Sequence, residues 1–159
     1  MVFIKKWWLI VILVFPLEVF NQTVLSPSEY KRKQILWEGE KYLGKRYRTK
    51  VGKSVFDCSG YVKFLMDGIN KRVTRSSVSQ INDGKKVDDI KDARPGDILV
   101  FKGRNARNNR PGHVGLVHHW SNDTLYFIHS STTKGVVIDN MKDPYYANRF
   151  LQVRDIIGN

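Results

Sequence analysis

The best candidates for chemistry in this chain are one thiol and two imidazoles. Cys58 is the only cysteine, and it directly follows Asp57, where a helix is predicted to begin. The partial positive charge at a helix start favours a thiolate, which is the nucleophilic form of cysteine. His113 opens one predicted strand, and His129 ends the next. If these strands are antiparallel neighbours, the two imidazoles lie together, which suits a base and its orienting group in thiol-based acyl transfer.

Each of these residues also has a plainer interpretation. A lone cysteine is commonly a small buried apolar side chain, and a histidine at a strand end commonly has only a structural role. His118 and His119, at the far end of the strand that His113 opens, are interpreted as structural or exposed. The catalytic interpretation of the other three residues is favoured because the lone thiol, the helix start, the strand-end histidines and a predicted export signal agree.

The predicted elements that position these residues are helices first and strands afterwards. Residues 26–29 combine a capping box with a proline in the first turn, and they predict a helix that Gly44 ends. Residues 44–56 are predicted to be loop. The other predicted elements are helices at 58–68 (capped by Asp57 or Ser54) and 76–82, and strands at 98–101, 113–120, 125–129, 135–138 and 150–157. Connections too short for helical crossovers predict an antiparallel sheet, and thus an α+β fold.

The composition is that of a globular protein with one domain. The chain has 159 residues, of which 42% are hydrophobic and 26% are charged, and these values exclude long disorder and collagen-like structure. One cysteine excludes an intramolecular disulfide and a zinc site made of four thiolates. The 27 basic residues exceed the 15 acidic ones, so the formal net charge is +12. Such a surplus favours polyanionic partners: nucleic acid, anionic lipid or an anionic cell-wall polymer.

The N-terminal segment predicts export. Two lysines stand among the first six residues, and residues 7–15 form an apolar run that Pro16 ends. This is the layout of a secretory signal, and the run is shorter than the roughly 20 residues that cross a bilayer as a helix. We therefore expect a signal peptide or an uncleaved N-terminal anchor at 1–25, and a catalytic domain at 26–159 in the periplasm or elsewhere in the cell envelope. In an oxidising compartment, an unpaired cysteine is either buried and inert or kept for its reactivity.

Five ordered motifs resemble those of the NlpC/P60 cysteine peptidases. The segment Asp57-Cys58-Ser59-Gly60 is similar to the nucleophile motif of that family, and the other four follow in the same order and with matching spacing. They are R-S-S-V-S-Q at 75–80, R-P-G-D-I-L-V-F at 94–101, G-H-V-G-L-V at 112–117 and I-H-S-S at 128–131. The similarity extends over residues 30–157. Residues 136–157 are particularly like the C-terminal segment of the small, single-domain Spr-type murein endopeptidases.

The resemblance implies a papain-like α+β fold, with N-terminal helices packed on an antiparallel sheet, and hydrolysis of peptides in the bacterial cell wall. Carried over position by position, Cys58 is the nucleophile, His113 the base and His129 the third residue that orients the base. The substrate-binding residues that the resemblance implies, in contact with a peptidoglycan stem peptide, are Tyr47, Asp57 and Ser59. No cofactor and no metal are implied. We expect a monomer that meets a membrane only through its N-terminal segment.

The bond that is cleaved stays open at this stage. The C-terminal similarity favours the D-Ala–diaminopimelate cross-link, and the alternative is the γ-D-Glu bond to diaminopimelate or lysine within one stem. Thr49-Lys50-Val51-Gly52 stands where the family usually has a pair of glycines, in a loop that shapes the substrate groove. A catalytically inactive wall-binding module on the same fold is the alternative from another class of function.

Other classes of function lack the motifs they need. A nucleic-acid partner is not expected, because the chain has no C2H2 finger, RNP motif or basic helix. A P-loop is excluded because Tyr47 stands where Gly52-Lys53-Ser54 would need a glycine. A zinc hydrolase is disfavoured because there is no H-E-x-x-H, and because His118 and His119, adjacent on a strand, are predicted to face opposite sides. The loop at 102–112 is hypothesised to line the groove and attract acidic substrate through its basic residues, Lys102, Arg104, Arg107 and Arg110; the alternative is an ordinary solvated loop.

Overall fold

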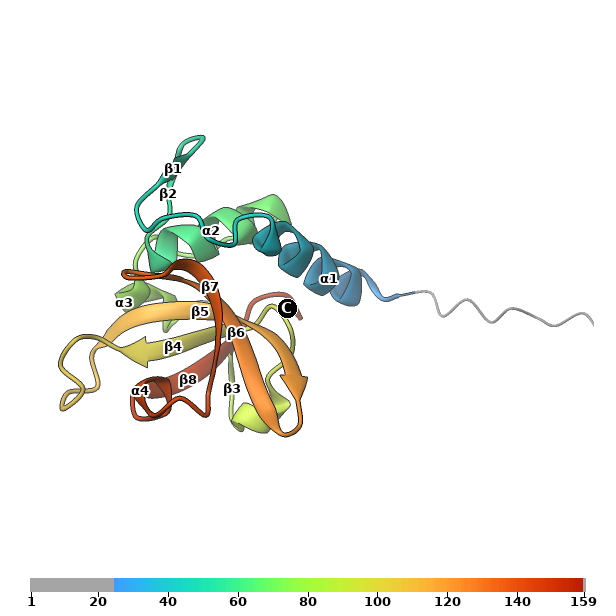
Figure 1. The fold of residues 1–159 in the computed structure, drawn as a ribbon. Coiled ribbons are helices and arrows are strands. Elements are labelled where there is room, and N and C mark those ends of the chain that lie inside the picture. The colour runs from blue at the N-terminus through green and yellow to red at the C-terminus, as the bar shows by residue number, and fades with distance from the viewer. Residues whose placement is uncertain (1–24, 159) are drawn as a thin grey trace, which may run out of the picture.

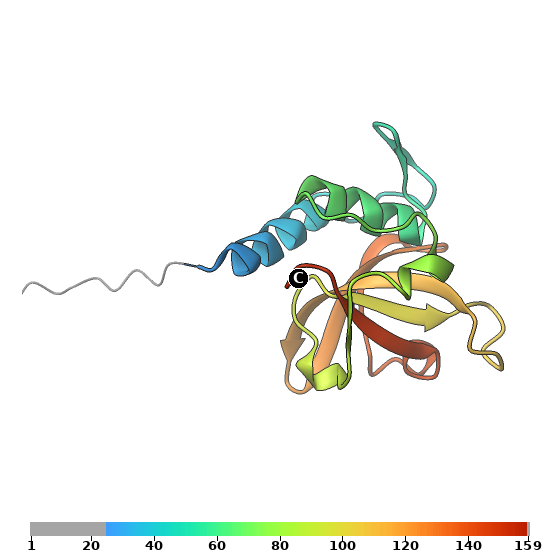
Figure 2. The ribbon, with the colours of Figure 1, turned by 180° about the vertical axis from the view of Figure 1, so that it is seen from behind.

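The structure is a computed structural model, and it describes residues 25–158. The signal peptide or anchor predicted at 1–25 therefore lies outside the described residues, apart from Leu25. Two helices, α1 (Pro27–Glu40) and α2 (Cys58–Gly68), lie over one face of a twisted sheet in both views (Figures 1 and 2). Within residues 25–158, no helix combines the length and the apolar character needed to cross a membrane.

Helix α1 begins as the sequence predicts. The Ser26 hydroxyl accepts a hydrogen bond from the Glu29 backbone N–H, and the Glu29 carboxylate accepts one from the Ser26 backbone N–H at 2.8 Å. These two bonds satisfy N–H groups that a helix start would otherwise leave unpaired. The helix ends at Glu40, and the chain continues as turns to Gly44, whose φ of +78° is a conformation that favours glycine.

Helix α2 is capped by Asp57, one of the two predicted alternatives. The Asp57 carboxylate accepts a hydrogen bond from the Gly60 backbone N–H at 2.8 Å, while Ser54 lies in a short strand. Gly60 is required here because a Cβ at this position would lie only 2.0 Å from the Val55 carbonyl oxygen. The motif glycine thus lets the first turn of α2, which carries Cys58, pack directly on the preceding backbone.

The main sheet is antiparallel and has six strands in the order β3-β8-β4-β5-β6-β7. One of its faces packs under α1 and α2, with Ile35, Leu65 and Val114 in the shared core. The opposite face holds a second apolar cluster that includes Phe101, Phe127 and Tyr146. The strands are β3 (Lys85–Val87), β4 (Ile98–Lys102), β5 (Pro111–Ser121), β6 (Thr124–Ser131), β7 (Gly135–Asn140) and β8 (Phe150–Asp155). The predicted α+β class, with helices against an antiparallel sheet, is confirmed.

Several short elements were missed or misjudged from the sequence. The predicted loop at 44–56 contains a hairpin of β1 (Lys50–Val51) and β2 (Ser54–Val55), and Gly52 takes a φ of +58° between the two strands. The predicted helix at 76–82 is one turn long. The short elements outside the main sheet are α3 (Ser77–Gln80), the 3-10 turn η1 (Ile90–Asp92) and α4 (Pro144–Ala147). Elements this short have too few residues to show a helical or strand period.

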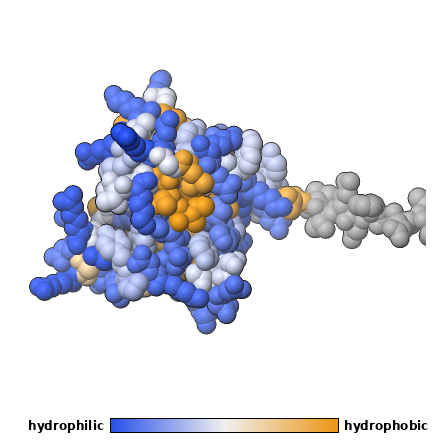
Figure 3. Space-filling model, in the orientation of Figure 1, coloured by the Kyte–Doolittle hydropathy of each residue, from blue (hydrophilic) through white to orange (hydrophobic). Residues whose placement is uncertain are grey.

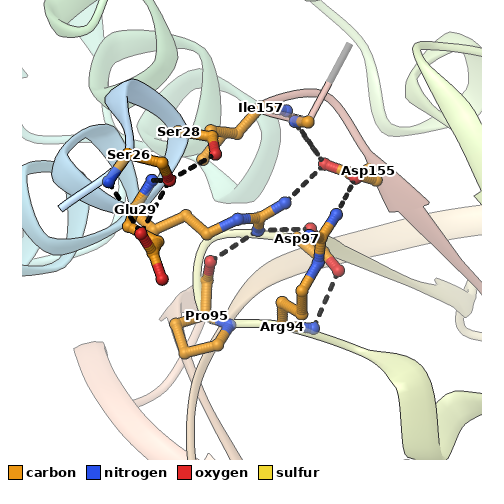
Figure 4. A network of polar contacts seen from close by, with 10 residues as sticks. Ser26, Ser28, Glu29, Arg94, Pro95, Asp97, Asp155 and Ile157 are labelled. Atoms are coloured by element: carbon orange, nitrogen blue, oxygen red, sulfur yellow. Dashed lines mark hydrogen bonds and ion pairs between the residues drawn. The ribbon is translucent and has the colours of Figure 1, made fainter.

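A buried ion-pair network fastens α1 to the sheet. The Arg32 guanidinium, whose side chain is 7% exposed, donates to Asp97 and to Asp155, each at 2.7 Å, and also to the Pro95 carbonyl. Arg94 binds the same Asp155 carboxylate from its other side (Figure 4). The chain before β4 and the end of β8 are thereby tied to the first helix.

The structure contradicts the prediction that the two adjacent histidines of β5, His118 and His119, face opposite sides of the strand. The pairing of β5 with β6 shifts by one residue between Val117 and His119, and such a bulge re-aims side chains. The Nδ1 atoms of His118 and His119 consequently lie 2.7 Å apart, and His118 Nε2 lies 2.7 Å from the Glu40 carboxylate of α1. The strand alternation assumed from the sequence fails because one residue is inserted into the ladder.

Candidate active site

One cleft brings the predicted thiol and imidazoles together. Cys58 at the start of α2, His113 near the start of β5 and His129 near the end of β6 all line a cavity of about 500 Å³. Tyr47 also lines this cavity. The antiparallel pairing of β5 with β6 produces the meeting, because it sets the beginning of one strand beside the end of the next.

The two imidazoles are joined directly. His113 Nε2 lies 2.9 Å from His129 Nδ1, and the two rings are perpendicular. Gly115, on β5, makes room for this arrangement, because a Cβ there would lie 2.9 Å from both the Cβ of His129 and the ring of Phe127. Burial is the main cause that lowers the pKa of His113, to about 3, and the neighbouring His129 lowers it further. His113 is therefore neutral at neutral pH and is able to take a proton.

The polar chain continues beyond the predicted residues to Asp139 on β7. His129 Nε2 lies 3.1 Å from Asp139 Oδ2, to which the Tyr146 hydroxyl also donates at 2.8 Å, and Lys134 Nζ lies 2.9 Å from Oδ1. Hydrogen bonding, first of all from His129, holds the pKa of Asp139 well below its ordinary value. A carboxylate surrounded by donors in this way stays ionised and acts only as an acceptor.

The ionised Asp139 carboxylate determines which ring nitrogen carries the hydrogen in both His129 and His113. His129 Nε2 must carry a hydrogen to donate to Asp139, so His129 Nδ1 is an acceptor. His113 Nε2 must then carry the hydrogen of the bond between the rings, which leaves the lone pair of neutral His113 on Nδ1. The arrangement can therefore accept a proton at Nδ1 of His113. Sequence reasoning missed Asp139 and Tyr146, although a carboxylate near the end of the strand that follows His129 was a readable signal.

The environment of Cys58 overturns the expectation of a low thiol pKa. Burial, with only 7% of the residue exposed, is the largest effect and raises the pKa of the thiol, and the Asp57 charge raises it further. Backbone N–H groups of Val114, Ser59 and Cys58 itself lower it but do not outweigh burial. The helix start contributes as expected, yet the strand packed over it excludes the water that a thiolate would need. The resting site thus holds a neutral thiol and a neutral imidazole.

Of the three predicted substrate-binding residues, Tyr47 lines the cleft, whereas Asp57 and Ser59 lie on either side of Cys58 at the start of α2. Tyr47 lies in the cleft, and burial raises the pKa of its hydroxyl, so the group remains a hydrogen-bond donor. Asp57 forms a two-pronged ion pair with Arg75, at 2.9 and 2.7 Å, and Ser59 donates to the same carboxylate at 3.2 Å. Asp57 and Ser59 therefore bracket the nucleophile position, but their polar atoms are already bound to one another and to Arg75.

Comparison with known proteins agrees with this geometry. The sequence model of the NlpC/P60 family matches residues 44–155, which include the whole cleft. The chain belongs to the NlpC/P60 family. It is 36% identical over 137 residues to a probable endopeptidase of Haemophilus influenzae, a match that covers 86% of this chain and 78% of that protein. It is also 32% identical over 124 residues to the murein DD-endopeptidase MepS/murein LD-carboxypeptidase of Escherichia coli K12, covering 77% of this chain and 58% of that protein.

Solved structures of other NlpC/P60 proteins share the fold. A Staphylococcus aureus NLP/P60 family protein superposes with a TM-score of 0.68 at 21% identity, covering 88% of this chain and 45% of that one. The NlpC/p60 domain of the peptidoglycan hydrolase SagA superposes with a TM-score of 0.61 at 21% identity, covering 78% of this chain and 97% of that domain. The predicted family, its fold and its enzyme class, an endopeptidase related to the small murein endopeptidases, are confirmed.

Proposed function

We propose that this NlpC/P60 protein is a peptidoglycan hydrolase that cleaves peptide bonds of the stem or the cross-link by a cysteine mechanism. The observation that carries the proposal is the continuous hydrogen-bonded chain from Asp139 through His129 to His113, whose two imidazoles line the same open cleft as Cys58. The names of the Escherichia coli and SagA relatives support a peptidoglycan substrate. Action in the cell envelope, reached through the predicted signal at 1–25, belongs to the same proposal.

Because the Cys58 thiol and the His113 imidazole are both neutral at rest, the thiol must lose its proton as it attacks the substrate. As the Cys58 sulfur forms its bond to the peptide carbonyl carbon, its proton passes to Nδ1 of His113, and the carbonyl oxygen becomes an oxyanion. The backbone N–H of Cys58 and the Tyr47 hydroxyl are the proposed donors to that oxyanion, and loss of one such donor typically lowers the rate by about 10²–10³. His113 then gives the proton to the leaving amine nitrogen, and the carbon–nitrogen bond breaks. Water hydrolyses the thioester, which frees Cys58.

The favoured bond is the D-Ala–diaminopimelate cross-link, because the Escherichia coli relative is named a murein DD-endopeptidase. The γ-D-Glu bond within one stem is the second candidate. A Bacillus subtilis relative named gamma-DL-glutamyl hydrolase favours it, with 27% identity over 164 residues that cover 98% of this chain and 37% of that protein.

Digestion of purified peptidoglycan tests the function and the bond together. We expect the wild-type protein to release soluble muropeptides, whose masses identify the new chain ends, and Cys58→Ala to reduce release to the background rate because the nucleophile is gone. Cys58→Ser is a second variant that preserves the shape of the first turn of α2. If Cys58→Ala, shown to be folded by circular dichroism, digests as fast as the wild type, the cysteine mechanism is wrong. If the folded wild type itself releases no muropeptides, the wall-binding alternative gains support.

A further inference from the structure

The β4–β5 connection places two cationic side chains in the cleft, and one of them has no hydrogen-bond or ion-pair partner within residues 25–158. Lys102 and Arg104 line the cavity together with Cys58 and His113. Lys102 donates to the Ala106 carbonyl of its own loop at 3.3 Å, whereas Arg104 forms no side-chain hydrogen bond or ion pair with any residue in 25–158. The neighbouring cation Lys134 is bound by Asp139. Arg104 is therefore the cleft cation that is available to a ligand.

Backbone packing fixes on which side of the cleft Arg104 stands. A Cβ at Gly112 would lie 2.4 Å from the Cα of Gly103, so the two ends of the loop are pressed together at glycines. The loop leads into β5 only two residues before His113. In Figure 1 it projects beyond the sheet, and the corresponding edge of the molecule in Figure 3 is hydrophilic, in contrast to the apolar patch near the centre of that view. The approach of Gly103 to Gly112 thus brings the backbone of Arg104 near that of His113, whereas Cys58 comes from a separate element, α2.

The position of the base decides which part of a substrate meets Arg104. In the proposed mechanism, His113 protonates the leaving amine, so the residue that departs lies on the His113 side of the sulfur. The cavity lining contains the cations Lys102, Arg104 and Lys134 but a single acidic residue, Asp143, whose carboxylate already accepts from the Tyr145 backbone N–H at 2.8 Å. A guanidinium without a protein partner matches a carboxylate in shape and charge.

We propose that Arg104, assisted by Lys102, forms a subsite for a carboxylate of the leaving residue. This inference rests on the proposed hydrolytic function. It states that bonds whose departing amino acid carries a free carboxylate are cleaved best, whether that carboxylate is the chain terminus or a side-chain group. It is more specific than a general attraction of acidic substrate by a basic loop, because one residue and one side of the scissile bond are named.

Soluble stem peptides that differ only in the leaving residue provide the test. Each peptide carries the bond identified by the muropeptide digestion, and the leaving residue has its terminal carboxylate free or amidated, and its side-chain carboxylate free or amidated. We expect one of these amidations to lower kcat/KM of the wild type by about fivefold, the upper range for an exposed charged pair, mainly through KM. The arm that shows the loss identifies which carboxylate is bound.

Arg104→Gln and the matched control Arg107→Gln complete the experiment. Arg107 lies in the same exposed loop and does not line the cavity. Arg104→Gln should cleave free and amidated peptides equally, while Arg107→Gln should keep the wild-type preference. Equal rates on all peptides with the wild type would overturn the subsite, as would identical losses in both variants, which indicate only general electrostatic attraction. Failure of the proposed function looks different, because then the wild type cleaves none of the peptides.

Discussion

Two buried polar networks at opposite ends of the sheet differ in whether they are closed or open. In the Arg32 network, Asp97 and Asp155 are bound by two guanidinium groups and by backbone N–H groups of residues 94, 157 and 158 (Figure 4). This network is closed at its carboxylates, although the Nε of Arg32 has no hydrogen-bond partner among the described residues. In the His113–His129–Asp139 network, each group is held by the next, but Nδ1 of His113, a residue that lines the cleft, has no hydrogen-bond partner among residues 25–158. The closed network serves stability, and the open one leaves a proton acceptor free for chemistry.

The largest effect should come from breaking the closed network. Arg32→Met leaves Asp97 and Asp155 buried without their shared cation, and removal of one partner of a buried ion pair typically destabilises a protein by about 3–5 kcal/mol. Urea unfolding measures the change in the free energy of unfolding. Arg94→Gln is the control: its side chain is 55% exposed, so we expect a loss below about 1 kcal/mol. Similar losses in both variants would show that the buried position of Arg32 has no special role.

The second largest effect should come from a substitution in the open network, and it should lower the catalytic rate. Asp139→Asn removes the charge that fixes the tautomers of His129 and His113, and we expect kcat of the folded variant to fall by about 10²-fold. The comparable loss in a serine-protease triad is about 10⁴, and Asp139 stands one residue further from the base. Tyr146→Phe, which removes one donor to Asp139 and leaves its charge, should cost less than Asp139→Asn. A kcat unchanged by Asp139→Asn would remove Asp139 from the mechanism.

The smallest effect concerns acid stability. His113 has a folded-state pKa of about 3 against an ordinary value of 6.5, so below pH 6.5 the unfolded chain binds a proton that the folded protein does not. The stabilisation is complete above pH 6.5 and is lost as the pH falls toward 3. Between pH 6.5 and 5.5 we expect a loss of about 1 kcal/mol, measured by urea unfolding. His113→Gln should reduce this slope without abolishing it, because burial also lowers the pKa of His129, and an unchanged slope would contradict a neutral His113 in the folded protein.

The comparison also shows which parts of the molecule were readable from sequence. The capping box of α1 and the strand-end positions of His113 and His129 depend on neighbouring residues, and these were predicted correctly. The Asp57 cap was one of two predicted alternatives, and the structure chose between them. Asp139 was missed because its meeting with His129 depends on how β7 pairs with β6. The Arg32 network was missed for the same reason, since Arg32 and Asp155 are 123 positions apart.

By itself, the sequence determined the family, the α+β class and the candidate thiol and imidazoles, because motif spacing and helix caps are local properties of the chain. Only the tertiary structure decided the protonation of the site. Packing of β5 over the start of α2 excludes water from Cys58 and raises the pKa of its thiol, against the effect of the helix start. The β-bulge that turns His118 toward His119 was decided in the same way, since both outcomes depend on strands that come together only in the folded chain.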